Sequence, residues 1–225
     1  MSNVSFFVDP SCPWAWVTSR WLVDVAPVRD LTITWKSYCI EIRDEYDLAP
    51  GFPSEHRALG LAAHELSHRM LRVFEAVRAE VGEPAVDALY TEWGPRYFGT
   101  DRSVLVAGGG SMINDCLAAC GLDPSLADAQ HDDKWDAQIL GSMQIAYAFA
   151  GQKAQTPTIV VESDPPYGFK GPVMCEAPTG EEAVRFWDAI QVIAEHQGFF
   201  ELVRPRKASP VPQDLRRSRA GLGLT

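Results

Sequence analysis

The chain of 225 residues, 46% hydrophobic and 22% charged, is long enough for one sizeable domain or one domain carrying an insertion, and its composition disfavours collagen-like, disordered and membrane-spanning classes. The net charge is −10, but residues 204–225 carry six basic side chains against one acid, so the body of the chain is at about −15. An acidic body repels phosphate backbones, and we therefore expect no nucleic acid and no membrane as partner.

The cysteines and the N-terminus indicate a cytoplasmic protein. Five is an odd number, and a chain of this size does not need disulfides for stability, so reduced thiols are expected. The opening segment, Met1–Val8, lacks the basic region and long apolar run of a secretory signal. The five are Cys12, Cys39, Cys116, Cys120 and Cys175.

The first forty residues predict a strand, a helix and a second strand. Val4–Val8 is almost wholly apolar, as a strand buried on both faces would be, and Asp9-Pro10 ends it. A helix follows from Pro13 to Pro27, and alternation in Leu31–Cys39 predicts the second strand. This order implies a parallel strand pair, with the loop after the first strand at the edge of the sheet where α/β proteins place their sites.

A helical block and a second sheet segment follow. After a loop at Leu48–Ser54, periodicity predicts an apolar stripe from Leu59 to Val81 and helices at Glu83–Tyr97, Ser111–Cys120, Ser125–His131 and Asp133–Gly151. The block is followed by a strand at Pro157–Glu162, a turn-rich stretch at Ser163–Gly171, a further strand and a helix at Gly180–Gln197. We therefore expect an α/β sheet domain from residues 1–50 and 152–202, a helical insertion at 51–151, and a flexible basic tail at 203–225.

Cys12 is the strongest candidate for a catalytic residue in this sequence. It lies directly after the first strand, where the first helix begins, so its sulfur would face unpaired N–H groups and the positive end of the helix dipole. Such a position is expected to lower the thiol pKa and yield a nucleophilic thiolate. The alternative from local sequence is a small buried cysteine that only fills space beside the strand.

Thr156-Pro157 is the second candidate element. A proline at the start of a strand is tolerated for ordinary reasons and means little alone. If the bond is cis, however, the Thr156 backbone would turn outward, where it could pair with a substrate bound at the Cys12 sulfur.

Together these segments resemble the thioredoxin fold and, more narrowly, the DsbA/FrnE-like thiol oxidoreductases, closest to the actinobacterial mycothiol-dependent reductases with a CPWC motif. The resemblance rests on four segments: Phe7–Trp21, Thr156-Pro157-Thr158, Gly171-Pro172-Val173 and Gly180–Asp188. It implies a thioredoxin-like α/β fold with an all-helical insertion, and an enzyme whose nucleophile is Cys12. It also implies that Pro13, Trp14, Ala15, Thr156 and Pro157 line the site for thiol and substrate.

This sequence departs from that family at two positions. The second active-site cysteine falls on Ala15, and a histidine that many members carry in the insertion falls near Phe98. A mixed disulfide at Cys12 must then be resolved by an external thiol. We expect no tightly bound cofactor, a low-molecular-weight thiol (mycothiol or glutathione) as co-substrate, and a disulfide or an electrophile such as a nitroaromatic as second substrate.

Two other functions remain open on the same fold. One is a thiol-dependent transferase or isomerase of the kappa type, similar to 2-hydroxychromene-2-carboxylate isomerase, which activates a bound thiol without a covalent link. The other is a redox-inactive binding protein. The sequence also leaves open whether the chain forms a homodimer.

A rival motif lies in the helical block, where residues 64–68 match the H-E-x-x-H pattern of zinc proteases. The apolar stripe of this helix places His64 and His68 about 160° away, on a face expected to be solvated. No third ligand is marked, so we expect no metal site here.

Overall fold

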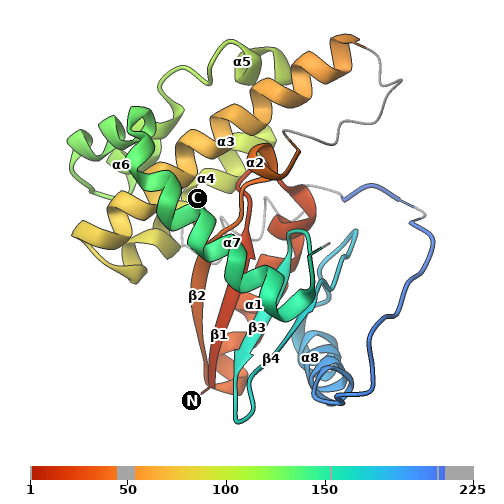
Figure 1. Cartoon of the computed structure of the whole chain (residues 1–225). Coiled ribbons are helices and arrows are strands. Elements are labelled where there is room, and N and C mark those ends of the chain that lie inside the picture. The colour runs from red at the N-terminus through yellow and green to blue at the C-terminus, as the bar shows by residue number, and fades with distance from the viewer. Residues whose placement is uncertain (1, 45–53, 153, 207, 211–225) are drawn as a thin grey trace.

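The computed structural model describes residues 2–44, 54–152, 154–206 and 208–210 (Figure 1). Its four-stranded sheet has the order β2-β1-β3-β4, with β2 parallel to β1 and the other neighbouring pairs antiparallel. The strands are β1 (Ser2–Val8), β2 (Leu31–Ser37), β3 (Thr158–Glu162) and β4 (Tyr167–Lys170). The four strands of the predicted order are confirmed, and β4, expected after the turn-rich stretch at Ser163–Gly171, begins within it.

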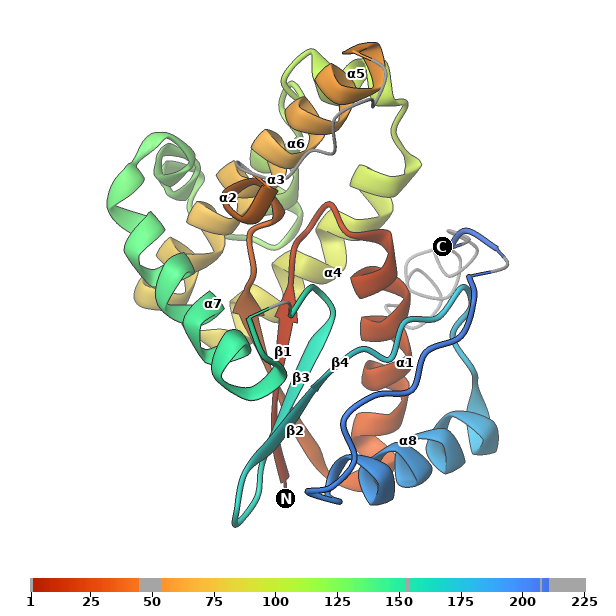
Figure 2. The same cartoon turned by 45° about the vertical axis from the view of Figure 1, so that its right-hand side comes forward.

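Helices cover both faces of the sheet, as Figure 2 shows. Strand β1 lies between β2 and β3, which explains its continuous apolar run, since Val4, Phe6 and Phe7 are fully buried. Helices α1 (Pro13–Arg29) and α8 (Gly180–Ala194) pack on one face, where the Trp21 indole N–H donates to the Ala183 carbonyl oxygen at 3.0 Å. Helix α7 (Asp136–Ala150) lies on the other face.

The remaining helices gather beyond the end of β1 and β2 that leads into α1 and α2. They are α2 (Ile40–Asp44), α3 (Ser54–Glu80), α4 (Glu83–Gly99), α5 (Arg102–Val106), α6 (Met112–Ala119) and the 3₁₀ segments η1 (Pro124–His131) and η2 (Asp133–Trp135). The helices predicted in this block are confirmed, although 125–131 is 3₁₀. The expected start of the insertion, near residue 51, lies outside the described residues.

A close contact at Gly94 fixes α4 against α1. A Cβ at this position would lie 2.2 Å from a ring carbon of Trp16, so only glycine allows the two helices to approach this closely. Trp16 also packs edge-to-face on Tyr90 of α4, with ring centroids 5.4 Å apart. Helix α1, whose N-cap is Cys12, is thereby held against both the sheet and the helical block.

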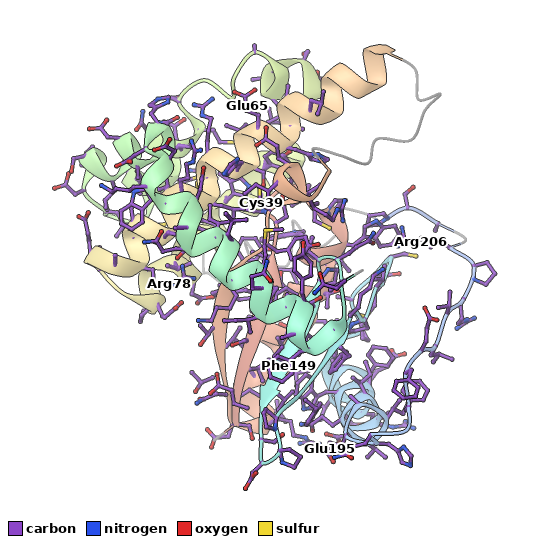
Figure 3. All side chains as sticks on the ribbon, in the orientation of Figure 1. Cys39, Glu65, Arg78, Phe149, Glu195 and Arg206 are labelled. Carbon is purple, nitrogen blue, oxygen red and sulfur yellow. The ribbon has the colours of Figure 1, made fainter. Side chains whose placement is uncertain are left out.

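Helix α7, which we predicted as part of the insertion, packs directly on the sheet. A Cβ at Gly168 of β4 would lie 2.7 Å from the Cβ of Phe149, which Figure 3 labels on α7. At the other end of the face, Tyr38 meets Tyr147 edge-to-face at 6.1 Å. None of the helices in the described ranges is both long and apolar enough to cross a membrane.

Candidate functional site

Cys12 is the N-cap residue of α1, as predicted. Its backbone N–H donates to the Asp9 carbonyl oxygen at 2.9 Å, and its own carbonyl oxygen accepts from the Trp16 N–H at 3.0 Å. Pro13 begins the helix, where its fixed φ and missing N–H cost nothing. The local sequence therefore holds the Cys12 sulfur at the first turn of α1.

The second predicted element lies beside this sulfur. The Cys12 thiol donates to the Thr156 carbonyl oxygen across 3.7 Å, and the Thr156–Pro157 bond is cis. The Thr156 hydroxyl donates in turn to the Phe7 carbonyl oxygen at 2.9 Å, which ties this loop to β1. Two segments 144 residues apart in sequence thus meet at one point.

The electrostatics of Cys12 differ from our expectation. The residue is only 6% exposed, and burial raises the pKa of its thiol to about 12. The backbone N–H groups of Ala15 and Trp14 act in the opposite direction, as the helix-terminus argument predicts, while the Asp9 carboxylate raises the pKa further. The expected lowering of the pKa is wrong for this conformation because desolvation outweighs the helix N-terminus.

Asp9 organises the loop, and sequence reasoning missed this role. Its buried carboxylate accepts from the Ser11 N–H at 2.8 Å and the Ser11 hydroxyl at 2.6 Å. It also accepts from the Ser67 hydroxyl at 2.5 Å and the Ile40 N–H at 2.6 Å. An acidic residue directly after a buried strand was the available signal, since a carboxylate there needs several donors.

The remaining predicted site residues differ in how exposed their side chains are. Pro13 and Trp14 are half-buried, whereas Ala15, in the place of the family's second cysteine, is fully buried. The Arg206 guanidinium lies over the Trp14 ring, 4.9 Å from its centroid, and Figure 3 places Arg206 on the C-terminal segment near this end of the sheet. The part of the predicted flexible tail that is described therefore contacts the site.

None of the other four cysteines, all of which the structure describes, forms a disulfide with Cys12. All five cysteines are free thiols. Cys116 is fully buried in the core, as expected, and Cys120 is half-buried against it. Phe98, where the family's histidine falls, packs 6.0 Å from Trp16, while the Trp93 indole N–H donates to the Pro10 carbonyl oxygen at 3.1 Å.

The two histidines of the H-E-x-x-H motif were predicted to lie on a solvated face of the helix, but the structure places them differently. His64 and His68 are both partly buried, and Glu65 is exposed on α3 (Figure 3). The His68 side chain is only 13% exposed, and its two ring nitrogens lie 2.8 Å from carboxylate oxygens of Glu41 and Asp136. The expectation for His68 is wrong because α2 and α7 pack against this side of α3, which a stripe read from one helix cannot reveal.

Comparisons with known proteins agree with this architecture. The family model described as Rv2466c-like, mycothiol-dependent nitroreductase Rv2466c, matches residues 11–204. The uncharacterised protein Rv2286c of Mycobacterium tuberculosis is 24% identical over 217 residues, which span 94% of this chain and 85% of that protein.

Two solved structures share the fold. The structure described as "probable DsbA oxidoreductase SCO1869" from Streptomyces coelicolor covers 93% of this chain and 97% of its own, at 18% identity and a TM-score of 0.56. The cytosolic disulfide reductase DsbM from Pseudomonas aeruginosa, solved with GSH, covers 84% of this chain and 99% of its own, at 12% identity and a TM-score of 0.56. The predicted DsbA-like thioredoxin fold with helical additions is thereby confirmed.

Proposed function

Because the chain belongs to the family of the mycothiol-dependent nitroreductase Rv2466c, we propose that it is a cytoplasmic thiol–disulfide oxidoreductase whose single working thiol is Cys12. The observation that best supports this is the position of the Cys12 sulfur at the first turn of α1, 3.7 Å from the Thr156 carbonyl oxygen. The N–H groups of that turn favour a thiolate once substrate or solvent reaches it. The neighbouring backbone of Thr156 can align an extended substrate.

The chemistry proceeds in two exchanges. The Cys12 thiol loses its proton to solvent and attacks a disulfide R–S–S–R, which forms Cys12–S–S–R and releases R–S⁻. A second thiolate, R′–S⁻, then attacks the R sulfur of this mixed disulfide, which yields R–S–S–R′ and regenerates Cys12. The electron pair comes from R′–S⁻, and Ala15 offers no internal thiol for the second step.

The co-substrate we propose is a low-molecular-weight thiol, with mycothiol preferred over glutathione. Mycothiol is named in the description of the matching family, and the DsbM structure, which shares this fold, holds GSH. A nitroaromatic is a further acceptor in the same scheme. Two thiols reduce R–NO₂ to R–NO and water, and Cys12 and the external thiol end as a mixed disulfide.

The thiol-dependent transferase or isomerase remains a second candidate because of one observation. The Cys12 thiol is buried and its pKa is raised to about 12, so an enzyme that only activates a bound external thiol would not require Cys12 as a thiolate. A redox-inactive binding protein would fit the same observation.

Intact-mass analysis distinguishes these functions. The protein is incubated with mycothiol disulfide and, separately, with glutathione disulfide. We expect one adduct, lost in Cys12→Ala and retained in Cys175→Ala, a half-buried cysteine whose thiol donates to the Ala208 carbonyl oxygen. Addition of excess thiol should release the adduct and restore the starting mass.

The contrary outcomes are equally specific. A protein that forms no adduct but accelerates a thiol-dependent isomerisation or transfer, with full activity in Cys12→Ala, would support the transferase or isomerase. A protein that forms no adduct and has no thiol-dependent activity would support the binding function. A stronger adduct with glutathione than with mycothiol would reverse the proposed preference between the thiols.

A further inference from the structure

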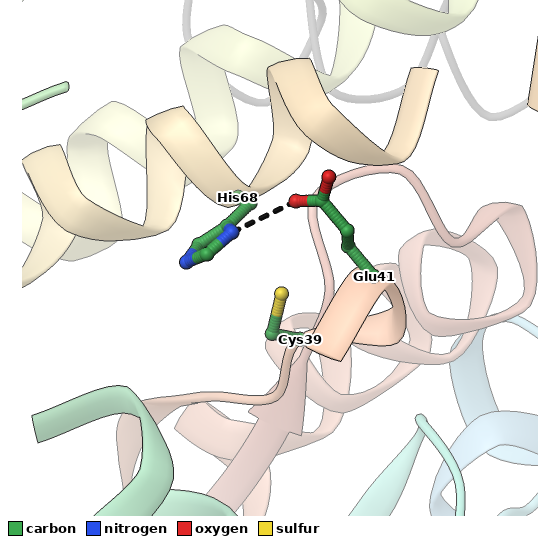
Figure 4. A group of neighbouring side chains, drawn as sticks. All are labelled: Cys39, Glu41 and His68. Carbon is green, nitrogen blue, oxygen red and sulfur yellow. Dashed lines mark hydrogen bonds and ion pairs between the residues drawn. The ribbon is translucent and has the colours of Figure 1, made fainter. Parts of the chain in front are cut away.

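Three metal-ligand side chains from separate segments meet away from Cys12. Cys39 lies between β2 and α2, Glu41 is in α2, and His68 is on α3 (Figure 4). One ligand atom from each, the sulfur, a carboxylate oxygen and a ring nitrogen, lies within 4.8 Å of the others. Cys39 is fully buried, while Glu41 and His68 are half-buried.

The surroundings of His68 orient its ring as in a metal site. Its Nε2 lies 2.8 Å from Asp136 Oδ1, and Asp136 is itself held by two hydrogen bonds from Arg72, at 2.7 and 2.6 Å. An imidazole that donates its Nε2–H to a fixed carboxylate presents the lone pair of Nδ1 on its other side. Metal-binding histidines almost always donate their other ring N–H to a carboxylate, a backbone carbonyl or water, which fixes the orientation of the ring.

The Nδ1 side of the ring faces a second carboxylate. Glu41 Oε2 lies 2.8 Å from Nδ1. In a neutral imidazole that donates from Nε2, the lone pair of Nδ1 would point at this carboxylate, and the two would repel each other. Either a second proton on the ring or a bound cation removes this repulsion. The Cys39 sulfur lies within 4.8 Å of both atoms, so a cation at this point would meet a ring nitrogen, a carboxylate oxygen and a sulfur from three separate segments.

We propose that Cys39, Glu41 and His68 bind one Zn²⁺ ion through sulfur, a carboxylate oxygen and Nδ1, with water as the fourth ligand. This mixed thiolate, imidazole and carboxylate set suits the borderline-soft, tetrahedral zinc ion. Cys39 releases its proton to solvent on binding. The site uses only the second histidine of the H-E-x-x-H motif and does not depend on the chemistry of Cys12.

Zinc at this position would join the sheet to the helical block. Its ligands come from the segment after β2, from α2 and from α3, and Asp136, which bonds to the His68 ring, is the first residue of α7. The Ile40 N–H, between two of the ligands, donates to the buried Asp9 carboxylate. The ion would therefore hold in place the segment that supports the loop before Cys12.

Zinc binding to the purified full-length protein, first stripped of metal, tests this site. Competition with a chromophoric chelator should give one saturable Zn²⁺ per chain. We expect His68→Gln to weaken binding by at least about 100-fold, since loss of a ligand should cost no less than the 10–100-fold loss typical for its outer-shell partners. The matched control is His64→Gln, one helical turn away on α3, which should bind as the wild type does.

Cobalt substitution identifies the sulfur ligand. Co²⁺ bound to the wild type should show a thiolate-to-cobalt charge-transfer band that is lost in Cys39→Ser and retained in Cys12→Ser. If Cys39→Ser does not fold by circular dichroism, Glu41→Gln replaces it and should shift the cobalt ligand-field bands. The absence of saturable zinc binding, an equal loss in His64→Gln, or a band lost with Cys12 instead would overturn the proposal.

Discussion

The Ser67 hydroxyl on α3 donates a 2.5 Å hydrogen bond to the buried Asp9 carboxylate after β1, and its oxygen also accepts from the Ser11 N–H at 3.0 Å. One serine thus connects the helical block to the loop that presents Cys12. If a buried carboxylate loses one of its hydrogen-bond donors, that hydrogen bond no longer offsets the cost of removing the carboxylate from water.

Ser67→Ala should therefore lower the free energy of unfolding by about 1.5–3 kcal/mol, the range for hydrogen bonds to charged groups. The matched control is Ser142→Ala on α7, a nearly buried serine whose hydroxyl has no partner among the described residues. That substitution should change stability by less than about 0.5 kcal/mol. Urea denaturation of both variants measures the difference, and equal effects would contradict the role of Asp9.

The reactivity of Cys12 should rise steeply with pH. Because burial raises its pKa from 9.0 to about 12, the thiolate fraction should increase nearly tenfold per pH unit until the pH approaches that value. Iodoacetamide labelling followed by peptide mapping measures the rate at Cys12 alone. A rate that levels off near neutral pH would show that the site opens in solution and that the helix N-terminus then dominates.

The same raised pKa predicts how stability depends on pH. The unfolded thiol ionises near pH 9.0 and the folded thiol only near 12, so the folded state binds the proton more tightly. This contribution is fully present below pH 9.0 and is lost as the pH rises towards 12. Urea midpoints on either side of pH 9.0 should fall less in Cys12→Ala than in the wild type, and parallel curves would argue against a buried neutral thiol.

Restoring the second thiol of the motif should change how Cys12 is resolved. In Ala15→Cys the introduced thiol lies three residues from Cys12, at the spacing of redox-active pairs. The mixed disulfide should then convert into an internal disulfide, seen in the intact mass as the loss of the adduct and of two hydrogens. Ala15→Ser is the control and should keep the adduct; an adduct that persists in both would place residue 15 out of reach of the sulfur.

The contact between Arg206 and Trp14 should influence substrate binding. The guanidinium lies over the indole face, which a planar aromatic substrate would need. Arg206→Ala should lower KM for an aromatic electrophile by up to about 5-fold, the equivalent of about 0.5–1 kcal/mol for an exposed cation–π contact. Arg204→Ala, an exposed arginine without a ring contact in the described residues, should leave KM unchanged. An increase in KM for Arg206→Ala would instead make the arginine part of the binding site.

Much of this molecule was predictable because local patterns decide it. The apolar run of β1 and the position of Cys12 before Pro13 depend on neighbouring residues only. The burial of Cys12, by contrast, comes from segments far away in the chain, such as the one containing Thr156. The donors to Asp9 and the carboxylates beside His68 likewise lie on other elements, so no helical or strand period in the sequence could reveal them.

The packing of α7 on the sheet limits how this protein can be shortened. A minimal redox domain made by joining residue 44 to residue 152 would remove every helix between them and leave the sheet face now covered by Phe149 open to water. Exposed apolar sheet surface promotes association between chains. Such a miniature should aggregate unless α7 is grafted back, so the sheet depends on α7 as a permanent cover.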